Sequence, residues 1–174
     1  CAICDGPVFA GQNVAIIGGG NSAVEAALDM VKIATHVHLV SLTQFTCEPI
    51  LSESLRKATN LSAYLQHQVV EIEGESFVEA VRIKDSASGE EKRLEVGGVF
   101  VEIGLVPNSE PVKGLAALNQ TGEVTVNSNC ETGVPGLYAA GDVTDVPEKQ
   151  IVVAAGEGAK AALQAHRYLQ RLAG

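Results

Sequence analysis

The stretch Asn13-Val-Ala-Ile-Ile-Gly-Gly-Gly-Asn-Ser-Ala-Val-Glu-Ala-Ala27 decides the fold of this chain. Its first part, residues 13–17, is almost entirely apolar, which is typical of a short strand buried on both faces of a parallel sheet. Three glycines follow at once, and apolar residues then recur at helical spacing up to Val31. A second apolar strand at 36–40 completes a βαβ unit. The sequence therefore predicts an α/β fold with a Rossmann-like nucleotide-binding domain.

The glycine loop fits the pattern G-x-G-x-x-A in the context that the pattern requires, between a strand and a helix. Gly18 permits the tight turn, Gly20 lets the backbone approach a pyrophosphate, and Ala23 lets the helix pack close to the sheet. The start of the helix presents free N–H groups and a positive dipole end to the phosphates. The predicted dinucleotide-binding residues are Gly18, Gly20, Asn21, Ser22 and Ala23. A glycine turn without a ligand is the alternative.

The end of the second strand normally distinguishes NAD from NADP. An acidic residue there binds the ribose 2′-OH of NAD, whereas an arginine accepts the 2′-phosphate of NADP. Residues 41–44, Ser-Leu-Thr-Gln, offer neither. A phosphate at this place would lack a charge-assisted partner, so the sequence favours NADH and leaves NADPH open. Glu48 is close by, and we expect it to be a solvated loop charge.

The segment between 50 and 103 changes from helical to β-rich character. A short helix is expected at 50–59, and the Ser88-Gly89 pair is typical of a hairpin turn. Strands are expected at 69–72, 77–84, 92–96 and 98–103. These strands predict an antiparallel ribbon inserted in the Rossmann-like domain.

Composition shifts again at 104–111, where two prolines and a glycine suggest a crossing between domains. Strand candidates follow at 123–127 and 136–140. Residues 151–172 are alanine-rich and periodic, which predicts a final helix.

The composition bounds the class of protein. Hydrophobic residues make up 46 % of the 174 and charged residues 19 %, which indicates a globular chain. The net charge of −9 argues against a nucleic-acid partner, which would need basic clusters. No apolar run approaches the roughly 18 residues that span a bilayer, and no signal peptide is visible, so we expect no membrane association and a cytoplasmic location. Because the chain begins at Cys1 without a methionine, we expect any N-terminal targeting signal to lie outside it.

Cys1-Ala-Ile-Cys4-Asp5 is the reactive candidate. Two cysteines at this spacing can close a small disulfide, and a lowered pKa in one of them makes a thiolate nucleophile. The neighbouring Asp5 carboxylate is placed to move protons during exchange. A zinc site would need a second close ligand pair, whereas Cys47 and Cys130 stand alone, so no metal is expected. Two buried thiols without a redox role remain the alternative.

Cys1-Ala-Ile-Cys-Asp-Gly6, about a dozen residues before the glycine loop, resembles the thioredoxin reductase family. Two later stretches, Gly104-Leu-Val-Pro-Asn108 and Gly136-Leu-Tyr-Ala-Ala-Gly-Asp-Val143, share this similarity. Val146-Pro-Glu-Lys-Gln-Ile151 and Gly156-Glu-Gly-Ala-Lys160 look most like the C-terminal part of the flavoprotein components, the F subunits, of alkyl hydroperoxide reductases. The similarity runs through the whole chain.

The resemblance implies a domain plan, because in this family an inserted NAD(P)H domain splits the FAD domain. Residues 1–9 would be the redox segment, 10–104 the NAD(P)H-binding domain, and 105–174 the C-terminal segment of the FAD-binding domain. The N-terminal FAD segment, with its own glycine loop, is absent from these 174 residues.

The resemblance also implies flavin-binding residues. Asp142, in the turn that Gly141 opens, would hold the ribityl–phosphate region of FAD. Gln150 and the backbone of Ile151 would approach the isoalloxazine, and the final helix would pack beside the flavin and in a homodimer interface. A simple helix-capping turn is the alternative for Gly141-Asp142.

The function implied by the resemblance is that of a flavin-dependent disulfide reductase. Hydride would pass from NAD(P)H to FAD, electrons would then reduce the Cys1–Cys4 disulfide, and the dithiol would reduce a thioredoxin-like or peroxiredoxin-linked partner. The family also rotates its nucleotide domain against its flavin domain, which makes 9–11 and 104–110 hinge candidates.

Two alternatives to this function stay open. The 174 residues alone would be a nucleotide-binding module without turnover, because half of the flavin site is missing. A regulatory or electron-entry variant that no longer uses a pyridine nucleotide is the other alternative, suggested by the bare stretch 41–44.

Overall fold

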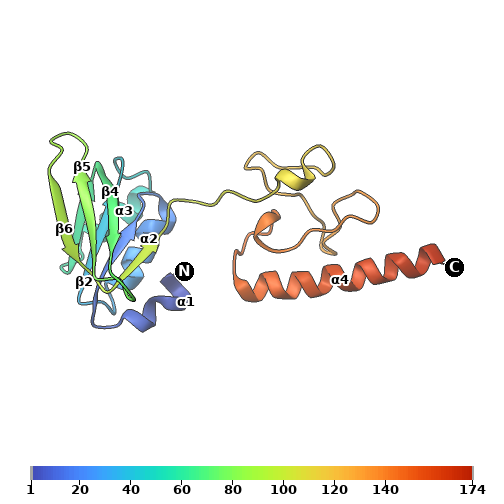
Figure 1. Ribbon diagram of the computed structural model, residues 1–174, viewed down its shortest axis with the longest axis horizontal. Coiled ribbons are helices and arrows are strands. Elements are labelled where there is room, and N and C mark those ends of the chain that lie inside the picture. The colour runs from blue at the N-terminus through green and yellow to red at the C-terminus, as the bar shows by residue number, and fades with distance from the viewer. Residues whose placement is uncertain (1, 174) are drawn as a thin grey trace. The chain divides into compact units, whose positions relative to one another are not determined.

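The structure is a computed structural model that describes residues 2–173. The chain divides into two compact units after Gly104 (Figure 1). We describe each unit by itself.

A four-stranded parallel sheet forms the centre of the first unit. The strands are β1 (Asn13–Ile17), β2 (His36–Ser41), β3 (Leu61–Leu65) and β7 (Gly98–Val101), in the order β3-β2-β1-β7. Helix α2 (Asn21–Met30) connects β1 to β2, and α3 (Pro49–Arg56) connects β2 to β3. All three strand pairs are parallel. The predicted βαβ unit and the α/β fold class are therefore confirmed.

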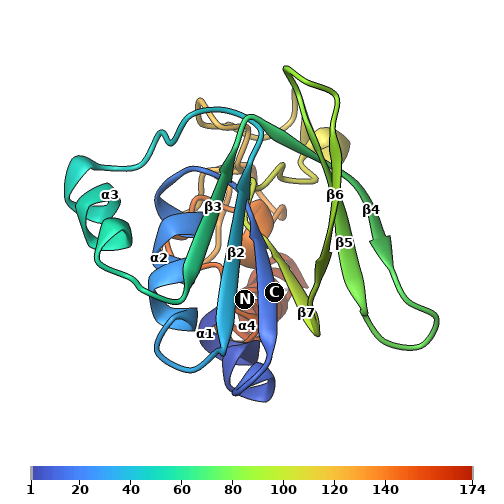
Figure 2. The same ribbon diagram turned by 90° about the vertical axis from the view of Figure 1, so that its left-hand side faces the viewer.

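An antiparallel ribbon covers the other face of this sheet. It contains β4 (His67–Glu73), β5 (Ala80–Asp85) and β6 (Glu91–Glu95), in that order. Figure 2 shows the ribbon on one side of the parallel sheet and the helices on the other. The β5–β6 hairpin turns at Gly89, whose φ of +75° only glycine adopts at low cost. The predicted ribbon and its turn at Ser88-Gly89 are confirmed.

Strand β1 is buried on both faces because it lies between these two layers. Val14 and Ile16 pack against the helices, while Ala15 packs against the ribbon, in the alternation that a strand imposes. All three side chains are fully buried. The nearly continuous apolar run at 13–17 is the signature of this position.

Several predicted boundaries in this unit were wrong. β7 leaves the ribbon and pairs in parallel with β1, so the stretch 98–103 belongs to the central sheet. β3 was not predicted, because an edge strand with the sequence Leu-Ser-Ala-Tyr-Leu is only partly buried and lacks a strong apolar pattern. The strand expected from residue 77 begins at Ala80, and Phe77 is exposed. Helix α3 ends at Arg56, three residues before the predicted end.

The N-terminal residues form two short helical turns, α1 (Ala2–Asp5) and the 3-10 turn η1 (Gly6–Phe9). Ala2 is buried in the core on the helical side of the sheet. A Cβ on Gly6 would lie 2.8 Å from the Met30 sulfur, so this segment packs tightly against the far end of α2.

The second unit contains little regular structure before its last helix. It has the 3-10 turns η2 (Glu110–Val112) and η3 (Gly141–Val143), followed by α4 (Ile151–Ala173). The strands predicted at 123–127 and 136–140 were wrong, because each stretch makes only isolated bridges. Asparagine side chains compete with a strand ladder here: Asn119 Oδ1 accepts the amides of Thr121 and Glu123, at 3.0 and 2.9 Å.

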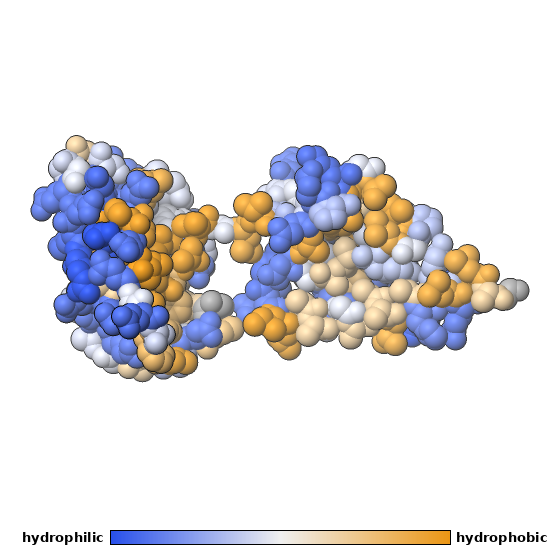
Figure 3. All heavy atoms as spheres, in the orientation of Figure 1, coloured by the Kyte–Doolittle hydropathy of each residue, from blue (hydrophilic) through white to orange (hydrophobic). Residues whose placement is uncertain are grey.

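The predicted final helix is confirmed in α4, which carries many exposed apolar side chains. None of its described residues is buried, and Ile151 and Val152 at its start are 91 % and 77 % exposed. Figure 3 shows apolar atoms at the surface of this unit along α4. Neither α4 nor any other helix within residues 2–173 combines the length and the apolar character needed to cross a membrane.

The Glu123 carboxylate lies at a junction of loops in the second unit. Lys149 donates to it at 2.8 Å, and Asn119 and Thr121 donate at 2.7 and 3.0 Å. The Lys149 hydrogen bond, followed by those of Asn119 and Thr121, lowers the pKa of Glu123 from 4.5 to about 2.

This lowered pKa predicts how E123Q changes acid stability. A carboxyl whose folded pKa is depressed stabilises the fold above its unfolded pKa, and the contribution is lost as the pH falls through the folded value. We expect E123Q to be less stable than wild type at pH 7, and the difference to shrink between about pH 4.5 and 2. Thermal unfolding of both proteins across this range measures it. A difference that does not change with pH would contradict the role of the charged carboxylate.

Candidate functional site

The glycine turn lies at the junction of β1 and α2. Gly18 has a φ of +145°, its amide donates to the Val40 carbonyl at 2.8 Å, and a Cβ there would lie 2.1 Å from the Glu102 carbonyl oxygen. A Cβ on Gly19 would lie 2.3 Å from the Ser41 hydroxyl. Both glycines are therefore required by close packing against the neighbouring strands and their ends.

Gly20 differs from the two glycines before it. A Cβ there would meet only the Thr46 hydroxyl, at 3.9 Å, so its surroundings are open. Gly20 is the N-cap residue of α2 in an extended conformation, and its carbonyl accepts the Val24 amide at 3.2 Å. The amides of residues 19–23 have no hydrogen-bond acceptor within residues 2–173. The turn therefore presents a row of unused donors, as an anion-binding helix start does.

A pocket of about 580 Å³ opens over this turn. It lies where the carboxyl ends of β1, β2 and β7 meet, the place at which open parallel sheets bind ligands. Three of the predicted nucleotide residues, Gly18, Gly20 and Ser22, line it. The other walls are formed by the loop after β2, the end of β7 and the start of β4: Ser41, Leu42, Thr43, Thr46, His67, Gln68, Val69, Glu102, Ile103 and Gly104.

The remaining two predicted nucleotide residues have supporting positions. Asn21 donates from Nδ2 to Glu48 Oε1 at 3.3 Å and accepts the Glu48 amide at 2.9 Å. Ala23 is fully buried beneath the turn. Glu48 is exposed, as predicted for a loop charge, but it also ties the loop after β2 to the start of α2. Residues 21 and 48 are far apart in sequence and match no pattern, so sequence reasoning missed this link.

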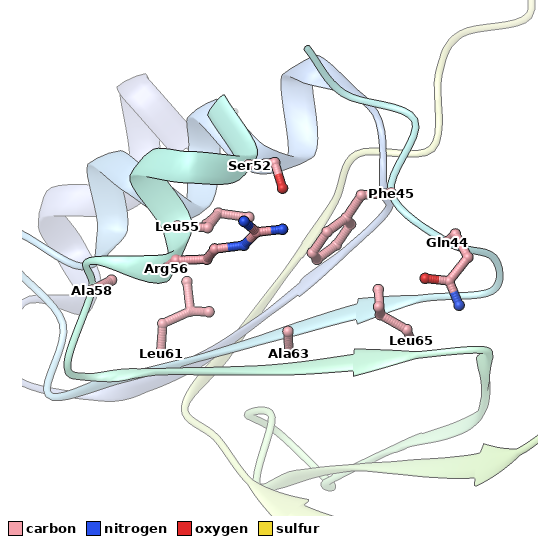
Figure 4. Close-up of a pocket in the computed structure, with 9 residues that line it drawn as sticks. All are labelled: Gln44, Phe45, Ser52, Leu55, Arg56, Ala58, Leu61, Ala63 and Leu65. Carbon is pink, nitrogen blue, oxygen red and sulfur yellow. The ribbon is translucent and has the colours of Figure 1, made fainter. Parts of the chain in front are cut away.

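A second pocket, of about 480 Å³, lies beside the same loop (Figure 4). Gln44 and Phe45 line it, whereas Thr43 and Thr46 line the pocket over the glycine turn. Figure 4 shows the Arg56 guanidinium reaching from α3 toward Phe45, across the side chains of β3. Arg56 is therefore a cation near the end of β2 that the search of residues 41–44 did not include.

The structure does not bring the predicted redox pair beside the glycine turn. Cys1 lies outside the described residues, and Cys4 is exposed on α1 with Asp5 next to it. This segment packs near Met30, at the far end of α2 from Gly20. A helix of ten residues is about 15 Å long, so α2 separates the two predicted sites. Among residues 2–173 no group of three His, Cys, Asp or Glu side chains could hold a metal ion.

The predicted flavin residues do come together in the second unit. Gly141 has a φ of +77°, its amide donates to Glu157 Oε2 at 2.9 Å, and a Cβ there would lie 3.0 Å from the Ala154 Cβ. This close packing fixes η3 against the first turns of α4. Asp142 is exposed on η3, and Gln150 and Ile151 lie where α4 begins. An exposed carboxylate beside an open helix start and exposed apolar side chains suits a ligand with hydroxyl, phosphate and flat apolar parts.

Comparison with known families decides the class of this chain. The sequence profile described as "Pyridine nucleotide-disulphide oxidoreductase" matches residues 5–158. The chain belongs to this family. The glycine turn, the parallel sheet and the ribbon are therefore features of a pyridine nucleotide-disulphide oxidoreductase.

Individual relatives of this pyridine nucleotide-disulphide oxidoreductase agree with the predicted resemblance. The F subunit of the alkyl hydroperoxide reductase of Escherichia coli strain K12 is 44 % identical over 173 residues, 98 % of this chain and 33 % of that protein. The same component in Staphylococcus aureus strain MRSA252 is 43 % identical over 172 residues, 98 % of this chain and 34 % of that protein. The chain thus spans about a third of the length of these curated relatives.

Solved structures give the same result for the fold. Thioredoxin reductase from Streptococcus pyogenes MGAS5005 superimposes with a TM-score of 0.89 at 32 % identity, covering 98 % of this chain and 56 % of that one. Thioredoxin reductase from Giardia duodenalis has a TM-score of 0.81 at 32 % identity, covering 98 % and 57 %. The predicted resemblance to the thioredoxin reductase family is confirmed.

The different surroundings of Gly18 and Gly20 predict different effects of the same substitution. G20A should keep the stability of the fold, because its Cβ meets open space, but should weaken nucleotide binding about tenfold or more by obstructing the pyrophosphate. G18A should destabilise the first unit by about 1–3 kcal/mol or more, since it combines a glycine-only φ with a clash.

Thermal unfolding and titration with NADH measure the two effects separately. Nucleotide binding by G20A that equals wild type would contradict the assignment of the turn.

Proposed function

We propose that this chain is the nucleotide-binding part, with half of the flavin site, of a flavin-dependent pyridine nucleotide-disulfide oxidoreductase. The observation that carries the proposal is the row of unused amides at residues 19–23, which opens into a pocket at the carboxyl ends of three parallel strands. The helix dipole and these amides would bind the pyrophosphate of NAD(P)H. The family membership and the relatives' names support the reaction class.

The domain plan of the proposal follows the two units. Residues 10–104 would bind the nucleotide, and residues 105–174 would supply Asp142, Gln150 and Ile151 to the flavin. When bound, FAD supplies the hydride acceptor and the source of electrons for a disulfide. Asp142 would accept hydrogen bonds from ligand hydroxyls, and the start of α4 would face the ring system.

Cys1 and Cys4 are the proposed redox pair. Two electrons and two protons convert their disulfide to a dithiol, and Asp5 is placed to move a proton. The dithiol would then reduce a partner disulfide by exchange through a mixed disulfide. The names of the relatives favour a peroxiredoxin-linked or thioredoxin-like partner and a homodimeric complete protein.

The separation of Cys4 from the glycine turn gives the proposal a mechanical requirement. Because α2 lies between them, the flavin cannot receive hydride at one and deliver electrons at the other in a single fixed arrangement of the first unit. Gly11 and Gly104, with φ of +74° and +93°, are the proposed hinge positions on either side of the nucleotide domain.

NADH is the proposed nucleotide, because the pocket over the turn contains no cation for a 2′-phosphate among its lining residues. We expect NADH to bind about tenfold more tightly than NADPH, and R56Q to leave both affinities unchanged, since Arg56 lines the neighbouring pocket. Titration of both nucleotides with wild type and R56Q measures this. A preference for NADPH that R56Q abolishes would make Arg56 the 2′-phosphate ligand and NADH the wrong assignment.

The 174-residue chain alone should be a binding module without turnover. We expect it to bind NADH but not FAD, because the phosphate loop and adenine pocket of the flavin site belong to a segment outside it. Flavin fluorescence during FAD titration, and NADH oxidation coupled to a disulfide dye with and without FAD, are the measurements.

The full-length protein is the positive control for this experiment and should turn over with bound FAD. Stoichiometric FAD binding by the 174 residues would contradict the half-site assignment. If neither NADH nor NADPH binds, the variant without a pyridine nucleotide is favoured instead.

A further inference from the structure

Lys149 connects three parts of the second unit through one ammonium group. Its Nζ donates to the Asp142 carbonyl at 3.3 Å, to the Thr144 carbonyl, and to Glu123 Oε1 at 2.8 Å. Its side chain is only 18 % exposed, and that of Glu123 is 23 % exposed. An ammonium has three N–H donors, so these contacts use its full capacity.

These contacts hold the turn that carries Asp142 at its carbonyl side. The amide side of the same turn is held by Glu157, which accepts the Gly141 N–H at 2.9 Å, while the Thr144 hydroxyl donates back to the Gly141 carbonyl at 2.7 Å. Lys149 therefore completes a polar frame around a three-residue turn that no strand supports. Because Lys149 directly precedes Gln150, the same side chain also fixes the start of α4 relative to this turn.

The charges in this frame leave the Asp142 carboxylate available. Lys149 contacts the main chain of Asp142, and Glu123 neutralises the ammonium. Among residues 2–173 the Asp142 carboxylate has no hydrogen-bond or ion-pair partner, and the residue is exposed. A charged acceptor in a fixed orientation suits ligand hydroxyl groups, since bonds to an ionised acceptor are stronger than neutral ones.

We propose that Lys149 is a positioning residue for flavin binding: its carbonyl contacts orient Asp142 and the first turn of α4 toward the ribityl–phosphate part of FAD. This inference rests on the proposed function, because it needs the second unit to contribute to a flavin site. It differs from a purely structural role in one respect. The pair with Glu123 stabilises the loops, whereas the two carbonyl contacts orient the turn.

The test separates these contributions by comparing variants of the full-length protein loaded with FAD. K149M removes all three contacts, E123Q removes the charge partner but keeps the carbonyl contacts, and K149R keeps a charged donor. K160M is the matched control, since Lys160 lies on the same helix but donates only to the Ser128 carbonyl, at 2.9 Å. The readouts are the dissociation constant of FAD, the flavin absorbance spectrum, and the thermal midpoint of the FAD-free protein.

We expect K149M to weaken FAD binding about tenfold or more, the size expected for loss of charge-assisted hydrogen bonds. E123Q, K149R and K160M should stay within about threefold of wild type, although E123Q lowers the thermal midpoint. If K149M does not fold, K149Q keeps one donor and should still bind FAD more weakly than E123Q.

Two results would overturn the inference alone: FAD binding by the Lys149 variants that equals wild type, or equal losses in K149M and E123Q, which would indicate a structural role. If the wild-type full-length protein binds no FAD, the proposed function fails and the inference fails with it.

Discussion

The structure depends on the close approach of the glycine turn to the ends of the neighbouring strands. Gly18 packs against the Glu102 carbonyl after β7, and Gly19 packs against Ser41 at the end of β2, at distances that exclude any side chain. This packing leaves no room for a longer loop between β1 and α2. It therefore aims the first amides of α2 at the sheet edge where three strands end. The same constraint that builds the fold also creates the candidate anion site.

The two units are held together by different physics. The first buries a continuous apolar strand between helices and ribbon, so its stability is mainly hydrophobic. The second has few buried apolar side chains, and charged or amide side chains such as Glu123 and Asn119 hold its loops. Such a polar frame can place a turn accurately without a sheet, and the exposed apolar start of α4 is what a segment of a larger domain would present.

The sequence predicted the central features because they obey short-range rules. The run at 13–17, the glycines and the following helix have the spacing that only a buried strand–turn–helix satisfies. Strand β3 and the parallel pairing of β7 depend on tertiary contacts that no local pattern contains. The loop from 42 to 48 folds back through the Asn21–Glu48 bonds, which two residues far apart in sequence cannot indicate. The position of Cys4 at the far end of α2 likewise follows from packing rather than from its spacing to the turn.

The central claim is that the amides of the turn bind the pyrophosphate of a dinucleotide. Amide NMR spectra of the ¹⁵N-labelled chain during titration with NADH test it most directly. The largest shifts should fall on residues 19–23, which have unused donors, while the Gly18 amide keeps its bond to the Val40 carbonyl. Saturating shifts confined to other residues, or no shifts in the turn at concentrations that bind NADH, would contradict the account.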